Sequence, residues 1–153
     1  MLTKNNPINL KELYTTDDYQ WLLENIELLK GQRFDDVDWE NLIEELEDLG
    51  SEKRNAVESL LEQVIRHLLL LEYWTEESER NSGHWKAEIR SFRTQLRRKL
   101  TTNLRNHLLQ ELPTIYDDAL GYVMAKTEGK ITNFPPECPY TLEQLLDFDW
   151  LSG

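Results

Sequence analysis

The chain has 153 residues, the length of one domain, and its 39% hydrophobic content with five Trp, six Tyr and four Phe excludes a disordered protein. Its formal net charge of −12 argues against general attraction to nucleic-acid phosphates, and its single cysteine excludes an internal disulfide and a multi-cysteine zinc site. The longest strictly aliphatic run, Leu68 to Leu71, is too short to span a membrane and no apolar signal core opens the chain, so we expect a cytoplasmic protein.

Residues 1–15 are expected to form a polar N-terminal arm, and a first helix is predicted over residues 16–30. Thr16 is placed to cap this helix, and Gly31 is placed to end it. After a short connection, Asp38 is placed to cap a second helix.

The second helix is predicted to run from Asp38 to about Tyr73, because apolar residues recur there at steps of three and four. Its apolar stripe consists of Trp39, Leu42, Ile43, Leu46, Leu49, Val57, Leu60, Leu61, Val64, Leu68 and Leu71. Gly50 costs about 1 kcal/mol relative to Ala in a helix, and Ser51 can cap a restart. The same stripe resumes beyond them, so we expect one long helix, with Gly50 as the point of any bend.

The polar segment TEESERNSG, residues 75–83, is predicted to be a turn region, and a third helix is predicted from Trp85 to about Gln110. Pro113 is expected to open a fourth helix that ends at Gly129, because the first helical position needs no backbone N–H.

Three prolines in KITNFPPECPY, residues 130–140, exclude a helix and favour an extended strap. A short terminal helix follows, with Thr141 and Gln144 at capping-box spacing. No stretch shows sustained period-two alternation, and short connections make successive helices antiparallel neighbours. The sequence therefore predicts a single all-α domain, residues 1–153. We expect an up-and-down antiparallel bundle of four main helices over residues 16–129, followed by the Pro-rich strap and short helix over residues 130–153.

Charge is unevenly distributed along the chain. Residues 35–62 hold eleven Asp or Glu against two Lys or Arg, whereas residues 80–110 hold eight Lys or Arg against one Glu. Four of these cations recur at steps of four, three and four, so they form one basic stripe on the third helix: Lys86, Arg90, Arg93 and Arg97. We expect the stripe to pair with the acidic second helix; a nucleic-acid groove is the alternative.

The start of the second helix, residues 36–48, carries seven carboxylates and no cation. A step of 100° per residue points Glu44 away from the apolar stripe and puts Glu45 and Glu47 on its two shoulders, so the carboxylates do not converge. Like charges four residues apart destabilise a helix by about 0.2–0.5 kcal/mol per pair. This pattern indicates a solvated acidic face with a cation near one shoulder, which the third helix is placed to supply.

His67 falls within the apolar stripe of the second helix, and His107 extends that of the third. Each fits a core position hydrogen-bonded to a carboxylate. The sharper alternative places His107 beside Glu44 or Glu47, to bind a divalent metal or to serve in acid/base chemistry. The sequence lacks the Glu-x-x-His motifs and paired histidines of bundle metal sites, so no metal or other cofactor is predicted. The candidate functional cluster is Glu44, Glu45, Glu47, His67, Arg93 and His107.

Cys138 lies in the strap, just before the short terminal helix. A cysteine there is either a small buried apolar residue or a thiol activated by the helix N-terminus. Both interpretations stay open at the level of sequence.

Three features occur together: the segment RFDDVDWENLIEELEDLG, the spaced set His67, Trp85, Ile89 and Arg93, and the segment FPPECPYTLEQLLD. Together they resemble the bacterial family known as domain of unknown function twenty-nine, common in photosynthetic bacteria, over about residues 14–150. The resemblance implies an all-helical domain with no assigned activity. It picks out Asn41, Glu44, Glu45, Glu47, Gly50, His67, Trp85, Arg93, Pro135, Cys138, Pro139 and Tyr140.

The surplus of acid beside a poor catalytic inventory favours a non-catalytic interaction or regulatory module. Such a module would bind a protein partner through its acidic face or its strap, as an antitoxin or inhibitor does, with no membrane partner. The first alternative is a metal-dependent or acid/base enzyme that uses the candidate cluster. The second is nucleic-acid binding through the basic stripe. The sequence leaves monomer and homo-oligomer open.

Overall fold

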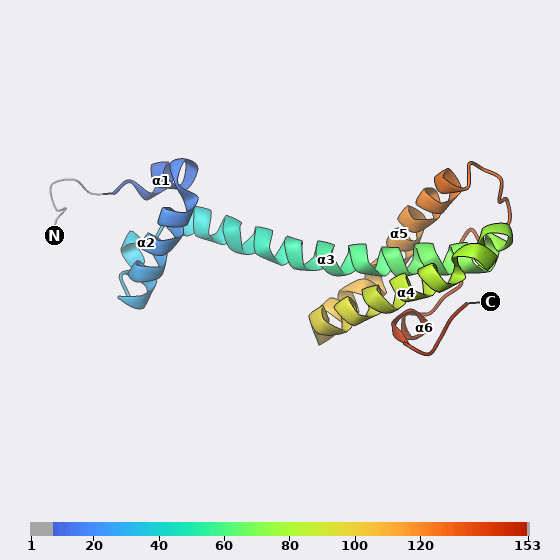
Figure 1. Ribbon diagram of the computed structural model, residues 1–153. Coiled ribbons are helices and arrows are strands. Elements are labelled where there is room, and N and C mark those ends of the chain that lie inside the picture. Colours follow the sequence, from blue (N-terminus) through green and yellow to red (C-terminus); the bar gives the residue numbers. More distant parts are fainter. Residues whose placement is uncertain (1–7, 153) are drawn as a thin grey trace. The chain divides into compact units, whose positions relative to one another are not determined.

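The computed structural model describes residues 8–152, and every regular element in that range is a helix (Figure 1). This confirms the predicted all-α helical class. Contacts within the chain gather in two compact units, residues 1–51 and 52–153. The two units are described separately below, and a single domain over the whole chain stays a prediction.

The first unit holds two short helices, a single 3-10 turn and the beginning of a long helix. These are α1 (Leu10–Thr16), α2 (Asp18–Lys30), η1 (Phe34–Asp36) and α3 (Trp39–Tyr73). The predicted polar arm is wrong over α1, because the Asn9 side chain accepts a hydrogen bond from the Glu12 N–H and caps a helix there. The part of the arm before Ile8 lies outside the described residues.

The predicted cap of α2 is also displaced by one residue. Asp17, rather than Thr16, accepts the hydrogen bond from the Gln20 N–H, at 3.0 Å. The Thr16 hydroxyl instead donates to the Glu12 carbonyl, 3.2 Å away, within α1. A carboxylate and a hydroxyl are comparable caps, so the sequence alone could not choose between the two neighbours.

A buried tryptophan with polar partners holds the first unit together. Trp21 is 1% exposed, and its indole N–H donates to Asp38 Oδ2 at 2.9 Å. The Asn25 side chain donates to the Trp21 carbonyl at 2.8 Å and accepts from the Asp38 N–H at 3.0 Å. Asp38 immediately precedes α3, so these bonds tie α2 to the start of the long helix.

Helix α3 is continuous through Gly50, as predicted. In the second unit its residues enter the main hydrophobic core, which includes Val57, Leu61, Val64, Ile65, Leu68, Leu69 and Leu70. Two further long helices complete that core, α4 (Thr75–Lys99) and α5 (Thr102–Lys126). The second unit is therefore an all-α bundle of three long helices, and the predicted first member of a four-helix bundle, residues 16–30, belongs to the first unit as α2.

The predicted boundaries of the third and fourth helices are wrong. Residues 75–83 are helical rather than a turn, and acidic side chains in that first turn favour the helix N-terminus. The chain breaks at Leu100 and Thr101, where the Thr101 hydroxyl accepts from the Leu104 N–H and caps α5. Pro113 lies inside α5, where it costs about 3 kcal/mol. Buried residues on both sides, Leu108 and Ile115, offset that cost by packing in the core.

The strap and the terminal helix are confirmed. Residues 130–141 contain no helix or strand, and α6 (Leu142–Leu146) begins with the predicted capping box of Thr141 and Gln144. The Tyr116 hydroxyl donates to the Pro135 carbonyl at 2.6 Å, and the Tyr140 hydroxyl donates to Glu72 at 3.0 Å. These bonds fasten the strap to α5 and α3.

The basic stripe binds the C-terminal segment, so its predicted pairing with the acidic helix is wrong. The buried Arg93 guanidinium donates to the carbonyls of Leu145 and Trp150, both at 2.8 Å. It also donates to the Gln144 carbonyl, at 3.1 Å. Carbonyls in the last turn of a helix lack partners and carry partial negative charge, which explains why α6 attracts this cation.

Two exposed members of the stripe also face the C-terminal segment. The guanidinium carbons of Arg90 and Arg97 lie 5.3 and 4.7 Å from the ring centroid of Phe148. Such cation–π contacts contribute about 0.5–1 kcal/mol each at exposed sites. Three of the four stripe cations therefore hold the chain's own C-terminal end.

Asp38 is predicted to make the first unit sensitive to acid. Burial by itself raises the pKa of Asp38, but hydrogen bonds from Asn41 and Trp21 outweigh it, so its pKa is lowered on folding. The stabilisation is present above the unfolded pKa and is lost as pH falls below about 4. Asp38→Asn should lower the free energy of unfolding by about 1–2 kcal/mol at neutral pH. It should also reduce the loss of stability in acid, and urea unfolding measures both effects. Asp35→Asn, at an exposed position, is the matched control and should leave both unchanged.

Arg93 is predicted to be the main anchor of the C-terminal segment. Arg93→Met removes the side-chain donor from the Leu145 and Trp150 carbonyls and one of two donors from the Gln144 carbonyl, which should lower the free energy of unfolding by about 2–4 kcal/mol. Arg98→Met, one turn further along and fully exposed, should change it by less than about 0.5 kcal/mol. Urea unfolding followed by circular dichroism measures both. Equal effects of the two substitutions would contradict the anchor.

Candidate functional site

The six residues of the candidate cluster are divided between the two units. Glu44, Glu45 and Glu47 are exposed residues of the first unit, whereas His67, Arg93 and His107 belong to the second. Arg93 holds the C-terminal segment, as described above. Glu45, His67 and His107 make separate contacts with Tyr14, Gln63 and Glu58.

The acidic start of α3 has its partners on α1 and not on the predicted third helix, residues 85–110. Lys11 Nζ lies 2.8 Å from Glu40 Oε2, and the Tyr14 hydroxyl donates to Glu45 Oε1 at 2.5 Å. The hydrogen bond with Glu45 raises the pKa of Tyr14 to about 12. The predicted cation beside the acidic face is thus present, but it comes from a helix that the sequence analysis did not predict.

The apolar stripe at the start of α3 is exposed. Its exposed members, here called the α3 stripe, have exposed fractions between 45 and 59%: Trp39, Ile43, Leu46 and Leu49. The prediction that these residues pack in the bundle interior is wrong. Helix α1 contacts the side of α3 that carries Glu40 and Glu45, and a step of 100° per residue puts the centre of the stripe roughly opposite.

His107 pairs with Glu58 rather than with Glu44 or Glu47. The His107 Nε2 and Glu58 Oε2 atoms are 2.6 Å apart. The break at Leu100 and Thr101 explains the difference, because it places His107 on α5 instead of extending the preceding helix. The interpretation of His107 as a histidine hydrogen-bonded to a neighbouring carboxylate is therefore confirmed.

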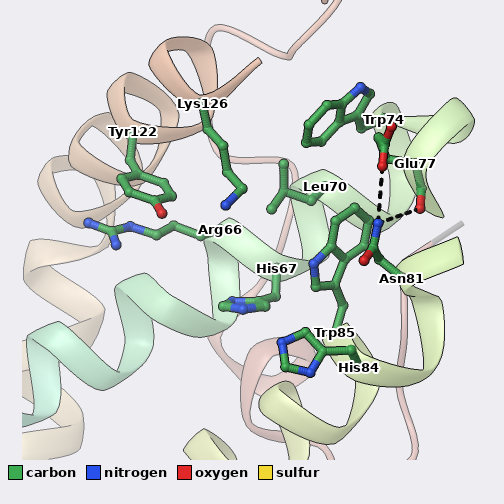
Figure 2. Close-up of a pocket in the computed structure, with 10 residues that line it drawn as sticks. All are labelled: Arg66, His67, Leu70, Trp74, Glu77, Asn81, His84, Trp85, Tyr122 and Lys126. Carbon is green, nitrogen blue, oxygen red and sulfur yellow. Dashed lines mark hydrogen bonds between the residues drawn. The ribbon is translucent and has the colours of Figure 1, made fainter. Parts of the chain in front are cut away.

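His67 lines a pocket in the second unit with a volume of about 340 Å³ (Figure 2). Helices α3, α4 and α5 all contribute to its walls. His67 Nδ1 lies 2.7 Å from the Gln63 carbonyl oxygen, and its ring centroid lies 5.5 Å from that of Phe92. A carbonyl can only accept, so Nδ1 carries the proton and the neutral ring keeps Nε2 as an acceptor. Burial lowers the pKa of His67 and favours this neutral form.

Charged side chains in the pocket are partly balanced by neighbours. The Glu77 carboxylate accepts hydrogen bonds from Arg80 at 2.8 Å and from Asn81 at 3.2 Å. The Asn81 side chain also donates to the Glu77 backbone carbonyl, at 3.0 Å. Arg66 forms an ion pair with Glu62 one turn earlier, and its guanidinium carbon lies 3.7 Å from the Tyr122 ring centroid. Glu77 and Arg66 each have a partner of opposite charge, so neither charge is left unbalanced.

The sequence analysis missed the α4 wall of this pocket. It assigned residues 75–83 to a turn, so Glu77, Asn81 and His84 carried no helical pattern. Their spacing of four and three residues is that of one helix face and could have indicated the wall. Trp85 was singled out through the family resemblance, and it also lines the pocket.

Cys138 has the properties of a partly buried structural thiol. Its Sγ lies 3.4 Å from the Tyr140 carbonyl oxygen, and burial raises its pKa. A raised pKa keeps the sulfur protonated at neutral pH, which disfavours nucleophilic reactivity. The interpretation as a small buried residue is the one that these observations support.

A family model described as domain of unknown function DUF29 matches residues 13–151. The chain belongs to this family. The match includes residues of both units, so the resemblance noted in the sequence is confirmed over nearly its whole length. No curated protein and no solved structure matches the chain.

Within residues 8–152, no group of three or more His, Cys, Asp or Glu side chains is arranged to hold a metal ion. None of the helices described in that range is long and apolar enough to cross a membrane. The family description itself assigns no activity.

His67 is predicted to make the second unit less stable in mild acid. Folding lowers the pKa of His67. The stabilisation by its neutral imidazole is therefore present above the unfolded pKa of about 6.5 and is lost as the pH falls below that value. The free energy of unfolding of the wild type, measured with urea, should therefore fall between neutral pH and a pH of about 5.5, where most carboxylates stay ionised. His67→Gln should show a smaller decline over the same interval. An identical decline in the variant would contradict burial of a neutral imidazole.

Proposed function

We propose that the chain is a protein-binding module whose contact surface is the α3 stripe. The observation that carries this proposal is four large apolar side chains exposed along one helix face: Trp39, Ile43, Leu46 and Leu49. Monomeric proteins scatter exposed apolar residues singly, whereas aligned groups on one face are typical of interaction sites. Trp is among the residues most enriched at the centres of protein interfaces.

The polar surround of the stripe suits an interface as well. Glu45 and Glu47 lie exposed on the two shoulders of the stripe, so an apolar centre has an acidic rim. Residues 1–51 hold thirteen Asp or Glu against four Lys or Arg, a formal net charge of −9 out of the −12 of the whole chain. Most of the charge surplus therefore belongs to the unit that carries the stripe.

The free energy of apolar burial, compared with the cost of association, favours a partner that adds charge contacts. Completing the burial of four half-exposed side chains contributes roughly 3–6 kcal/mol, taking half of the full-burial value for each. Association costs an estimated 4 kcal/mol or more in lost translational and rotational freedom. Apolar contact alone is therefore insufficient for stable binding, and cations opposite the acidic rim would supply the remainder and steer the encounter.

These considerations point to a basic amphipathic helix of another protein. A second copy of this chain would bring two acidic rims together, and like charges facing each other disfavour that pairing. A helix that presents Leu, Ile or Phe on one face with Lys or Arg beside them would match both the stripe and its rim. Masking of a basic segment in this way is what an antitoxin or inhibitor does.

A synthetic amphipathic helix of Leu and Lys is the probe for this surface. Fluorescence anisotropy of the labelled peptide should show binding to the full chain that Leu46→Ala weakens about fivefold, through the loss of about 1 kcal/mol of apolar contact. The matched control is Leu109→Ala, which truncates an equally exposed leucine of α5 and should leave the affinity unchanged.

Two further arms separate the stripe from simple charge attraction and from self-association. A peptide of the same charge with Ser in place of Leu should bind at least about fivefold more weakly. Sedimentation should show a monomer that Leu46→Ala does not alter. Equal affinity for both peptides, or dimerisation lost in Leu46→Ala, would overturn the proposed partner.

A further inference from the structure

The pocket around His67 offers a cation that lacks a carboxylate partner. Among the described residues, the Lys126 ammonium is in no ion pair, and it lies 5.8 Å from the ring centroid of Tyr122. Figure 2 draws Lys126, Arg66 and Tyr122 together on one side of the pocket. A lysine and an arginine beside an aromatic ring attract an anion and repel a metal cation.

The opposite side of the pocket is aromatic. Trp74 and Trp85 are stacked, with ring centroids 6.3 Å apart and an interplanar angle of 22°. Both indoles line the pocket, and Figure 2 places them across from the cationic side. Large flat side chains of this kind bind planar rings by stacking and by excluding water.

The indole N–H of Trp85 has no hydrogen-bond partner within residues 8–152. Trp85 is only 6% exposed, and none of the hydrogen bonds of the described chain involves its ring nitrogen. Figure 2 draws that nitrogen on the side facing His67 and His84. An indole N–H can only donate, so this one is available to an acceptor on a ligand.

His67 provides the complementary acceptor. Its Nδ1 is committed to the Gln63 carbonyl, which leaves Nε2 bare in the neutral ring. The pocket therefore combines a cation, an N–H donor, an imidazole acceptor and two stacked aromatic rings. Its volume of about 340 Å³ is within the range of small-molecule sites.

We infer that this pocket binds a small heteroaromatic anion, with its ring against Trp74 and Trp85 and its acidic group at Lys126. A ring N–H of the ligand suits His67 Nε2, and a ring nitrogen or acidic oxygen suits the Trp85 N–H. A carboxylate and a phosphate share the required charge. The site is in the second unit and is independent of the protein-binding stripe on the first.

Two pairs of probes test this inference and distinguish the acidic groups. Indole-3-carboxylate is compared with indole, and adenosine monophosphate with adenosine, each added to the full chain labelled with ¹⁵N. The readout is the indole N–H signal of Trp85, identified by its absence in Trp85→Phe. We expect the anionic member of at least one pair to bind at least about tenfold more tightly than its neutral counterpart, as followed by the shift of this signal. This is a difference of about 1.4 kcal/mol in binding free energy.

Lys126→Met is the decisive variant, because Lys126 is exposed at the end of α5 and its loss leaves the core intact. It should weaken binding of the anion about tenfold and leave binding of the neutral probe unchanged. Lys99→Met removes an exposed lysine from the last turn of α4, away from the pocket lining, and should have no effect.

Three results would overturn the inference. The first is no shift of the Trp85 signal with any of the four probes at millimolar concentration. The second is equal affinity for the charged and neutral members of both pairs. The third is an equal effect of Lys126→Met and Lys99→Met, which would reduce the role of Lys126 to overall charge.

Discussion

The second unit depends on one buried cation. The Arg93 guanidinium donates to three carbonyls at the C-terminal end of the chain, two of them in the last turn of α6. A helix end without partners is costly to bury, and a planar guanidinium with several donors satisfies it in one contact. Arg90 and Arg97 contact Phe148 of the same segment, so three of the four cations of the basic stripe are used within the molecule. The charge pattern that first suggested a nucleic-acid groove is thereby explained by folding.

The first unit is stabilised differently. Its interior is small, and a network of Trp21, Asn25 and Asp38 replaces an extended apolar core. Such a network fixes the start of α3 while covering little of its apolar surface. The α3 stripe remains exposed in consequence, next to most of the chain's negative charge. That combination of apolar centre and acidic rim is the basis of the proposed protein-binding role.

The two candidate sites use opposite chemistry. The α3 stripe joins apolar side chains to carboxylates and suits a basic amphipathic helix. The pocket of the second unit joins stacked indoles to Lys126 and suits a small anion. Each can be altered by a substitution on one helix that leaves the other unchanged. A regulatory protein that senses a small anion and binds a protein would need two such sites.

The sequence by itself determined the helical class, the continuity of α3 through Gly50 and the capping box of α6, because helical period and capping are local properties. It could not place the break at Thr101, since Pro113 is the stronger local signal and core packing on both sides outweighs it. Only the tertiary structure decided the partners of Arg93 and His107. Those contacts join residues far apart in the chain, and their choice depends on which helix ends and apolar faces compete for the same side chain.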